Sequence, residues 1–269
     1  MRALTRVIGL ALILSISLPA WALAADDGGM LAAVKKRGAM RVGFSTFVPW
    51  AMQDKNGNFI GFEIDVATRL AKDLGVKAEF IPTKWAGIIP ALLTGQFDII
   101  IAGMSVTPER AEKVDFSMPY DYAGMDIVAN KQKAAGFSSL DDFNKPEVIL
   151  SARTGGSAKA AIEAHMPKAT VRYFDEEAQA LQEVLTGRAH AFISSAPQPA
   201  FQAAKHPDIL FRPLPDTFTK EPIAFALRKG DAASLKELNA WIEKARQDGW
   251  LKDRKHYWFE TTDWEPLLK

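Results

Sequence analysis

The sequence contains no cysteine. A lipid-modified N-terminus requires a cysteine at its cleavage point, so no lipid anchor is expected. Disulfide bonds are also excluded, but a chain of 269 residues does not depend on them, because it can bury a sufficient apolar core. The missing cysteines therefore set no limit on folding outside the cell.

The sequence also carries almost no net charge. It has 33 Lys and Arg residues against 32 Asp and Glu residues, and the basic residues form no stripe. Proteins that bind nucleic acid concentrate positive charge along one surface. No nucleic-acid partner is therefore expected.

No apolar run is long enough to cross a membrane. Residues 7–18 form a run of roughly a dozen residues, whereas a transmembrane helix needs about 20. The surrounding features are typical of a secretory signal, with two arginines, a proline and a small-x-small motif, namely Arg2, Arg6, Pro19 and Ala22-Leu23-Ala24. We predict a signal peptide over residues 1–24 rather than a membrane anchor, cleavage before Ala25, and a mature protein free in the periplasm.

The rest of the sequence alternates strand-like and helix-like segments, which favours an α/β fold. In the first half we expect strands at 40–45, 77–82 and 97–102 and helices at 61–74 and 86–94. In the second half we expect strands at 148–152, 170–174 and 190–194 and helices at 158–165 and 176–186. A strand at 223–227 and a long amphipathic helix follow. Glycines that end the helical segments are Gly75, Gly95, Gly187 and Gly249.

Each half is a unit of alternating strands and helices, and such units bind ligands at the carboxyl ends of their strands. We predict a periplasmic-binding-protein-like fold of two α/β lobes with the ligand cleft between them. The first lobe comprises residues 25–122 and 224–269, and the second comprises residues 123–223. The chain crosses near 122–125 and 221–224, and the two crossings form a two-stranded hinge about which the lobes can close.

The sharpest local signal for binding is the segment 102–110, Ala-Gly-Met-Ser-Val-Thr-Pro-Glu-Arg. Thr107 and Pro108 suit the start of a helix, whose unpaired N–H groups attract anions. Arg110 adds a planar set of donors that fits a carboxylate. The alternative is that Thr107 only caps a helix and that Arg110 pairs with a surface acid such as Asp115.

A second candidate is the segment 154–157, Thr-Gly-Gly-Ser, between a predicted strand and a predicted helix. Gly155 and Gly156 would let backbone N–H groups approach a ligand, and Ser157 would cap the helix. Such a turn is common by itself. Together with the segment 102–110, it would direct two helix N-termini at one cleft, which favours an anionic group there.

Aromatic side chains near the same strand ends suit the apolar walls of a cleft. Phe47 follows the first strand and Trp85 precedes the second helix, and we expect both to contact the ligand. Trp50 is the less favoured wall residue, since it could pack beneath the loop. The aromatic residues near the C-terminus are expected to be packing residues: Trp241, Trp250, Tyr257, Trp258 and Phe259.

Several motifs occur in order along nearly the whole mature chain: Arg37-Gly38 with Met40-Arg41-Val42-Gly43-Phe44, Asn56-Gly57 with Gly61-Phe62-Glu63-Ile64-Asp65, Thr107-Pro108-Glu109-Arg110, Phe116-Ser117 with Pro119-Tyr120, Gly187-Arg188 and Trp258-Phe259. On these the chain resembles the bacterial extracellular solute-binding proteins of family 3, the periplasmic amino-acid-binding components of ABC importers. The resemblance implies a hinged, two-lobed fold, a membrane ABC permease as partner, no cofactor and a monomer.

The resemblance also implies a set of ligand contacts. Arg110 binds the ligand carboxylate. Backbone and hydroxyl donors come from both lobes, and two aromatic rings flank the ligand side chain: Gly103, Ser105, Gly156, Ser157, Phe47 and Trp85.

Two positions depart from the family pattern. Binders of α-amino acids usually carry an aspartate at the strand end after the Gly-Arg pair, and often a second acid after the first strand; these places hold Ser195 and Ser45. Enclosing an ammonium group without an acid costs roughly several kcal/mol. Either the ligand lacks that group or another acid binds it, and Glu221 is our candidate. The alternative is that Glu221 pairs with Lys220, Arg228 or another cation of the hinge.

The same scaffold can carry an enzyme. Cyclohexadienyl dehydratases are similar to these binding proteins and use an acid placed much as Glu221 is, which a closed cleft could make a general acid. The histidines are scattered through the sequence, and no catalytic triad, metal cluster or phosphate loop is evident. We therefore expect a binding protein for a small carboxylate-bearing ligand, an amino acid or related organic acid, and not an enzyme.

Overall fold

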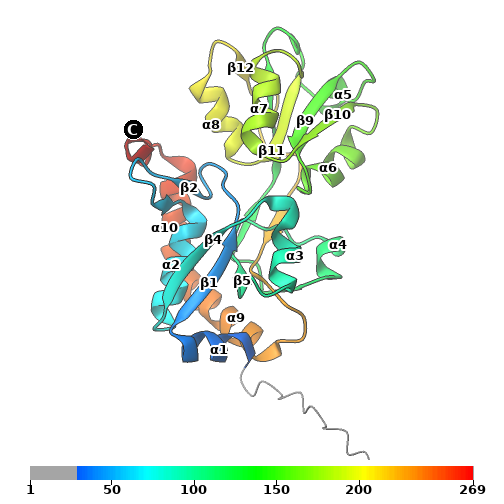
Figure 1. The fold of residues 1–269 in the computed structure, drawn as a ribbon. Coiled ribbons are helices and arrows are strands. Elements are labelled where there is room, and N and C mark those ends of the chain that lie inside the picture. Colours follow the sequence, from blue (N-terminus) through cyan, green and yellow to red (C-terminus); the bar gives the residue numbers. More distant parts are fainter. Residues whose placement is uncertain (1–28, 269) are drawn as a thin grey trace, which may run out of the picture.

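The protein forms two α/β lobes, one above the other in Figure 1. The computed structural model describes residues 29–268. The predicted fold class, two α/β lobes, is confirmed by two separate five-stranded sheets. The predicted signal peptide, residues 1–24, lies outside the described residues. Within residues 29–268, no helix combines the length and the apolar character that a membrane span requires.

The first lobe is built on a mixed sheet in the order β4-β1-β5-β14-β6. β1 runs parallel to β4 and β5, whereas β14, from the C-terminal part of the chain, runs antiparallel to its neighbours. A short hairpin of β2 and β3 follows β1. The strands of this lobe are β1 Ala39–Phe44, β2 Met52–Gln53, β3 Phe59–Ile60, β4 Lys77–Pro82, β5 Ile99–Ile100, β6 Asp115–Phe116 and β14 Ala226–Leu227.

Helices pack against this sheet and follow the expected apolar spacing. In α2, Phe62, Val66 and Leu70 are buried at four-residue intervals, and Gly75 beyond the helix end has a positive φ of 72°. The helices are α1 Gly29–Arg37, α2 Phe62–Asp73, η1 Trp85–Gly87, α3 Ile88–Leu93, α4 Pro108–Ala111, α9 Ala232–Gln247, α10 Trp250–Lys255, η2 His256–Glu260 and η3 Glu265–Leu268.

The second lobe repeats the architecture with a sheet in the order β10-β9-β11-β8-β12. β9 is parallel to β10 and β11, so the carboxyl ends of these strands face the first lobe. Its strands are β8 Met125–Asn130, β9 Ile149–Arg153, β10 Thr170–Phe174, β11 Ala191–Ser195 and β12 Leu210–Phe211. Its helices are α5 Leu140–Phe143, α6 Ala158–His165, α7 Glu177–Leu185 and α8 Gln198–Lys205.

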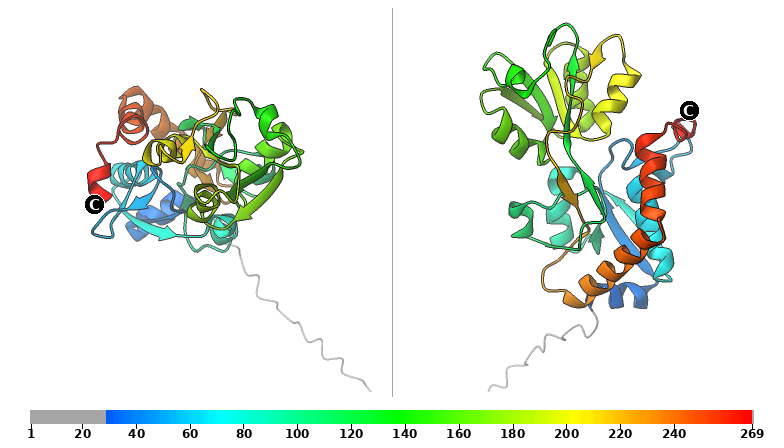
Figure 2. Two further views of the ribbon diagram at one scale, coloured as in Figure 1. Left: turned by 90° about the horizontal axis from the view of Figure 1, so that it is seen from above. Right: turned by 180° about the vertical axis from the view of Figure 1, so that it is seen from behind.

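Two extended segments connect the lobes (Figure 2). They are β7 Asp121–Ala123 and β13 Glu221–Ile223, which pair antiparallel. β13 also lies beside the loop before α4, since Val106 N donates to Pro222 O and Ala224 N donates to Met104 O. The hinge pair is thus in direct contact with the segment 102–110. The lobe boundaries at residues 122/123 and 223/224 remain our proposal.

Two predicted strands are shorter than expected. The strand at 97–102 is reduced to β5, although Ile101 N still donates to Gly43 O just beyond it. The strand at 223–227 is divided into β13 and β14, because its first part pairs with β7 and its second part with β5 and β6. The change of partner comes where the chain passes from the hinge into the first lobe.

Candidate ligand-binding cleft

A small cavity lies between the lobes and is lined by both of them. Its volume is about 20 Å³, so the cleft is nearly closed. Seven residues predicted for the site line it: Phe47, Trp85, Gly103, Ser105, Gly156, Ser157 and Ser195. Residues that the sequence analysis did not select complete the wall: Met125, Arg153, Ala158, Glu177, Ile193 and Ser194.

Arg110 lies on an adjoining groove rather than on the wall of the small cavity. This groove has a volume of about 680 Å³ and shares Trp85, Gly156 and Ser157 with the cavity. The Arg110 side chain is 8% exposed, and its guanidinium carbon lies 5.4 Å from the centroid of the Trp85 ring. Arg110 is therefore buried where the two lobes meet, close to Trp85 and outside the wall of the small cavity.

The local sequence places Arg110 as expected. Thr107 caps α4, its Oγ1 accepting from Arg110 N at 3.3 Å, and Pro108 is the first helical residue. The guanidinium Nη1 donates to Ser105 O at 2.8 Å, and Nη2 donates to Gly155 O of the other lobe at 3.1 Å. The alternative pairing with Asp115 is wrong, since that carboxylate accepts from a backbone N–H near α9.

The charge of Arg110 has no ion-pair partner within residues 29–268. Burial lowers the pKa of its guanidinium, the charge of Glu221 opposes that effect, and the neighbouring Arg153 lowers the pKa further. Both hydrogen-bond acceptors of the guanidinium are peptide carbonyls, which carry only partial charge. A buried cation in this state favours an anion, and a carboxylate matches its planar donors.

The turn 154–157 connects the two lobes, because one of its backbone carbonyls accepts hydrogen bonds from side chains of the first lobe. Gly155 O accepts from Arg110 Nη2 and from Trp85 Nε1, the latter at 3.0 Å. Ser157 occupies the N-cap position of α6 as expected, but its side chain makes no capping hydrogen bond, and its Oγ lies 3.5 Å from Ser105 Oγ across the cleft. The backbone of residue 157 is already helical, with φ −67° and ψ −14°, whereas a side-chain cap typically requires an extended backbone at that position.

Gly103 is required by the backbone at the base of the cleft. Its φ is +62°, and a Cβ atom there would come within 2.9 Å of the Trp50 ring. Trp50 is 1% exposed and stacks on Phe47 at 5.6 Å between centroids. Trp50 therefore packs beneath the loop, and Phe47 is the ring that reaches the cavity.

Arg153 and Glu177 are the main residues that the sequence analysis missed. Arg153 ends β9, and its guanidinium carbon lies 5.0 Å from the Phe47 centroid and 4.5 Å from the Trp85 centroid. Its Nε lies 3.3 Å from Glu177 Oε1, and Glu177 Oε2 accepts from Ser194 Oγ. Burial raises the pKa of Glu177, while Arg153 and Ser194 lower it. The signal that was available is the position of Arg153 at the carboxyl end of a strand.

Glu221 lies on the hinge strand β13 and does not line the cavity. Its Oε1 accepts from Thr219 Oγ1 at 2.9 Å, and its Oε2 is buried without a hydrogen-bond partner among the described residues. Neither alternative partner holds it: Arg228 donates to carbonyls of the first lobe, and Lys220 lies over the Tyr122 ring. The role of Glu221 in binding an ammonium group therefore stays a prediction.

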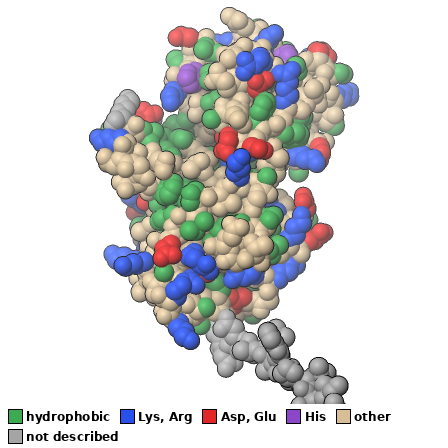
Figure 3. Space-filling view, in the orientation of Figure 1, with side chains coloured by type: hydrophobic (Ala, Val, Ile, Leu, Met, Phe, Trp, Pro, Cys, Tyr) green, Lys and Arg blue, Asp and Glu red, His purple; other side chains and the backbone are tan. Residues whose placement is uncertain are grey.

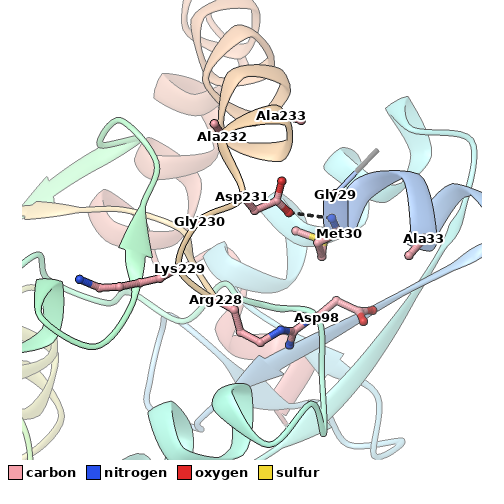
Figure 4. A pocket seen from close by; sticks show the side chains of 10 residues that line it. All are labelled: Gly29, Met30, Ala33, Asp98, Arg228, Lys229, Gly230, Asp231, Ala232 and Ala233. Carbon is pink, nitrogen blue, oxygen red and sulfur yellow. Dashed lines mark hydrogen bonds between the residues drawn. The ribbon is translucent and has the colours of Figure 1, made fainter. Parts of the chain in front are cut away.

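Another pocket, of about 640 Å³, lies at the far end of the first lobe where α1 meets α9 (Figure 4). Three of its four described charged side chains already bind other parts of the first lobe. Asp231 accepts from Met30 N, Asp98 pairs with Arg37 and Arg41, and Arg228 donates to Leu92 O and Phe97 O. Across residues 29–268 there is no cluster of three or more side chains that could hold a metal ion. The interlobe cleft is the better candidate site.

Residues 40–261 match the sequence profile of the bacterial extracellular solute-binding proteins, family 3. The chain belongs to this family. The L-cystine-binding protein TcyJ of Escherichia coli K12 is 30% identical over 96% of this chain and 95% of its own length. A cyclohexadienyl dehydratase of Pseudomonas aeruginosa is 27% identical over 84% of this chain and 85% of its own. Binding components of ABC transporters thus prevail among the relatives of this family member, although one relative is an enzyme.

Solved structures of other solute-binding proteins have the same fold. The ancestral amino-acid-binding protein AncCDT-1, a precursor of cyclohexadienyl dehydratase, is 43% identical with a TM-score of 0.78, covering 86% of this chain and 99% of that one. A putative ABC-transporter binding component from Wolinella succinogenes, complexed with lysine, is 39% identical with a TM-score of 0.80 over the same shares. This family member is thus an amino-acid-type solute-binding protein by fold and by sequence.

Proposed function

We propose that this protein binds a small carboxylate-bearing ligand between its lobes in the periplasm and delivers it to a membrane ABC permease. The family supports transport as the general role, and its members use small amino-acid ligands. The ligand carboxylate, the periplasmic location, the monomeric state and the other cleft contacts belong to the proposal. Figure 3 shows acidic and basic side chains interspersed on one face, which fits a small-molecule ligand better than a polyanion.

The observation that carries the proposal is the state of Arg110. Its guanidinium is buried at the meeting point of the lobes, and its hydrogen bonds run to one carbonyl of each lobe. A carboxylate that replaced those carbonyls would neutralise the charge and accept two parallel hydrogen bonds. Because Ser105 O and Gly155 O belong to different lobes, ligand binding at Arg110 would be coupled to the distance between them.

The test is calorimetric titration of purified protein that has been unfolded and refolded to remove carried-over ligand. Amino acids, keto acids and dicarboxylates form the panel. Arg110→Met should weaken binding of every carboxylate ligand by about 30-fold or more, because removing one member of a buried charge pair costs roughly 2–5 kcal/mol.

Arg188→Met is the matched control, since Arg188 is exposed in the second lobe and pairs with Glu183. It should leave the dissociation constants unchanged. Binding curves for Arg110→Met that superimpose on those of the wild type would refute the role of Arg110. Absence of binding by any panel member to the refolded wild type would refute the proposed function itself.

Similarity to a dehydratase makes turnover a necessary control. The binding function predicts that a bound ligand is recovered unchanged after prolonged incubation. Prephenate or arogenate incubated with the protein should likewise yield no product by chromatography. Product formation that Glu221→Gln abolishes would instead establish the enzymatic alternative.

A further inference from the structure

Arg153 places a positive charge from the second lobe between two aromatic rings of the first. Its guanidinium carbon lies 5.0 Å from the Phe47 centroid and 4.5 Å from the Trp85 centroid. Cations favour the faces of aromatic rings, so the Phe47 and Trp85 rings already interact with a cation of the protein itself. Phe47 and Trp85 are the residues expected to flank the side chain of a ligand.

The donors of Arg153 are not used by the protein. The residue is 7% exposed, and within residues 29–268 its side chain donates no hydrogen bond that meets normal geometry. Its Nε lies 3.3 Å from Glu177 Oε1 but is poorly aligned with it. Nε is the Arg153 donor that is buried without a hydrogen bond, and leaving a buried donor of a charged group unpaired is costly. The arrangement therefore calls for an acceptor from outside the protein.

The hydroxyls around Arg153 do not fill that need. Ser194 Oγ donates to Glu177 Oε2, and Ser105 Oγ and Ser157 Oγ lie 3.5 Å from each other. Glu177 is the acid on the wall of the cavity and lies beside the Arg153 guanidinium, while a second guanidinium, that of Arg110, lies close to Trp85 on the adjoining groove. Among the described residues Arg153 is thus the one cation on the wall of the small cavity, and the charges of Glu177 beside it and of Glu221 near Arg110 offset part of the positive charge of the two guanidiniums.

We propose that Arg153 is a specificity-determining residue, which makes the cleft select ligands with a second anionic group and reject ligands with a cationic side chain. Dicarboxylates are the chemical class that fits, with one carboxylate on Arg110 and the other on Arg153. A lysine-like side chain would have to enter the space between Phe47 and Trp85, where it would meet Arg153 as a like charge. The inference rests on the proposed function, because it concerns the same ligand.

The lobes must separate, or the Arg153 side chain must turn, before a ligand enters. The cavity of about 20 Å³ is far smaller than the roughly 300–1,000 Å³ of a typical small-molecule pocket. Arg153 and the two aromatic rings come from opposite lobes, so opening the hinge would withdraw the guanidinium from between the rings. When the lobes closed over a dicarboxylate, the Arg153 guanidinium would return to its place between the rings and donate hydrogen bonds to a ligand carboxylate.

The experiment compares ligands that differ in one charge. L-glutamate and L-glutamine are nearly isosteric, 2-oxoglutarate and succinate lack the ammonium group, and L-lysine and L-arginine carry a distal cation. Dissociation constants are measured by calorimetry for the refolded wild type and for Arg153→Met, which keeps an unbranched side chain but loses the charge. Arg188→Met again serves as control.

The wild type should bind the preferred dicarboxylate about 10- to 100-fold more tightly than the matching monocarboxylate, the range expected for hydrogen bonds to a charged group. Arg153→Met should abolish that ratio and improve binding of lysine or arginine by about tenfold or more. Glu177→Gln, which frees Arg153 from its counter-charge, should strengthen dicarboxylate binding. If the amine-bearing and amine-free dicarboxylates differ, the stronger one identifies whether an ammonium group is accepted.

Three results would overturn the inference. Lysine or arginine binding the wild type as tightly as a dicarboxylate would do so, as would an unchanged preference in Arg153→Met. In both cases carboxylate ligands still bind, and the proposed function survives. Failure of every ligand to bind wild-type protein would overturn the inference and the proposed function together.

Discussion

Glu63 provides a test of the fold that is independent of any ligand. This carboxyl group, in the first turn of α2, is fully buried; its Oε2 accepts from Tyr120 Oη at 2.6 Å, and its Oε1 has no partner among the described residues. Burial raises its pKa from 4.5 to about 8, against smaller opposing effects of the Tyr120 hydroxyl and the Gly103 amide; the charge of Asp121 raises it further. The folded protein therefore holds a proton on Glu63 at neutral pH.

That proton makes stability depend on pH with a definite sign. Between pH 4.5 and about 8 the unfolded chain has lost the proton while the folded protein keeps it, so the free energy of unfolding falls as pH rises. The slope approaches 1.4 kcal/mol per pH unit, which gives about 4 kcal/mol between pH 5 and pH 8 as an order of magnitude. The contribution is complete below the unfolded-state pKa and is lost through the folded-state pKa.

The perturbation is Glu63→Gln, because an amide oxygen can accept from Tyr120 but does not titrate. Denaturant unfolding followed by tryptophan fluorescence, at unit steps from pH 5 to pH 8, gives the free energy of unfolding for both proteins. The two should agree near pH 5, and the variant should become progressively more stable than the wild type toward pH 8. Tyr120→Phe removes a donor that lowers the pKa of Glu63 and should extend the decline in stability to higher pH. Parallel curves for wild type and Glu63→Gln would show that the reasoning is wrong.

Two further substitutions test the cleft. Gly103→Ala should lower the free energy of unfolding by about 1–2 kcal/mol or more, because φ is +62° and the added methyl meets Trp50 at 2.9 Å; an unchanged melting temperature by calorimetry would contradict this. Trp85→Phe keeps an aromatic ring but loses the Nε1 bond to Gly155 O, at a cost of about 0.5–1.5 kcal/mol, so the ligand-free protein should shift roughly two- to tenfold toward the open form. Small-angle scattering would report that shift as a larger radius of gyration, and identical scattering curves would count against an interlobe role for this bond.

The sequence predicted most of what depends on local patterns. Apolar spacing located α2 and α6, and the Thr-Pro sequence located the start of α4 with its cap and Arg110. These features are set by residues close together in the chain. The strand-helix alternation likewise predicted two α/β lobes.

What the sequence did not reveal depends on contacts between distant segments. Arg153 is an ordinary residue at a strand end until the hinge brings it to Phe47, more than a hundred positions earlier, and Glu177 is an ordinary residue of a first helical turn until Arg153 lies beside it. The division of the strand at 223–227 has the same origin, since both of its parts pair with segments more than a hundred positions earlier in the chain. No local spacing encodes these pairings.

The position of β14 sets the order in which the chain can fold. This strand lies between β5 and β6 in the first sheet, and α9 packs against α1. The lobe that contains the N-terminal part of the described chain is therefore completed by segments near the C-terminus. A chain emerging from the ribosome exposes its N-terminal end first. The middle of the polypeptide can form its own sheet at once, whereas the segment before it must wait, with one strand edge uncovered, until nearly all of the protein has been made. A chaperone that shields unpaired strand edges during synthesis would therefore bind the N-terminal part of the nascent chain, which is made first, and not the part made last.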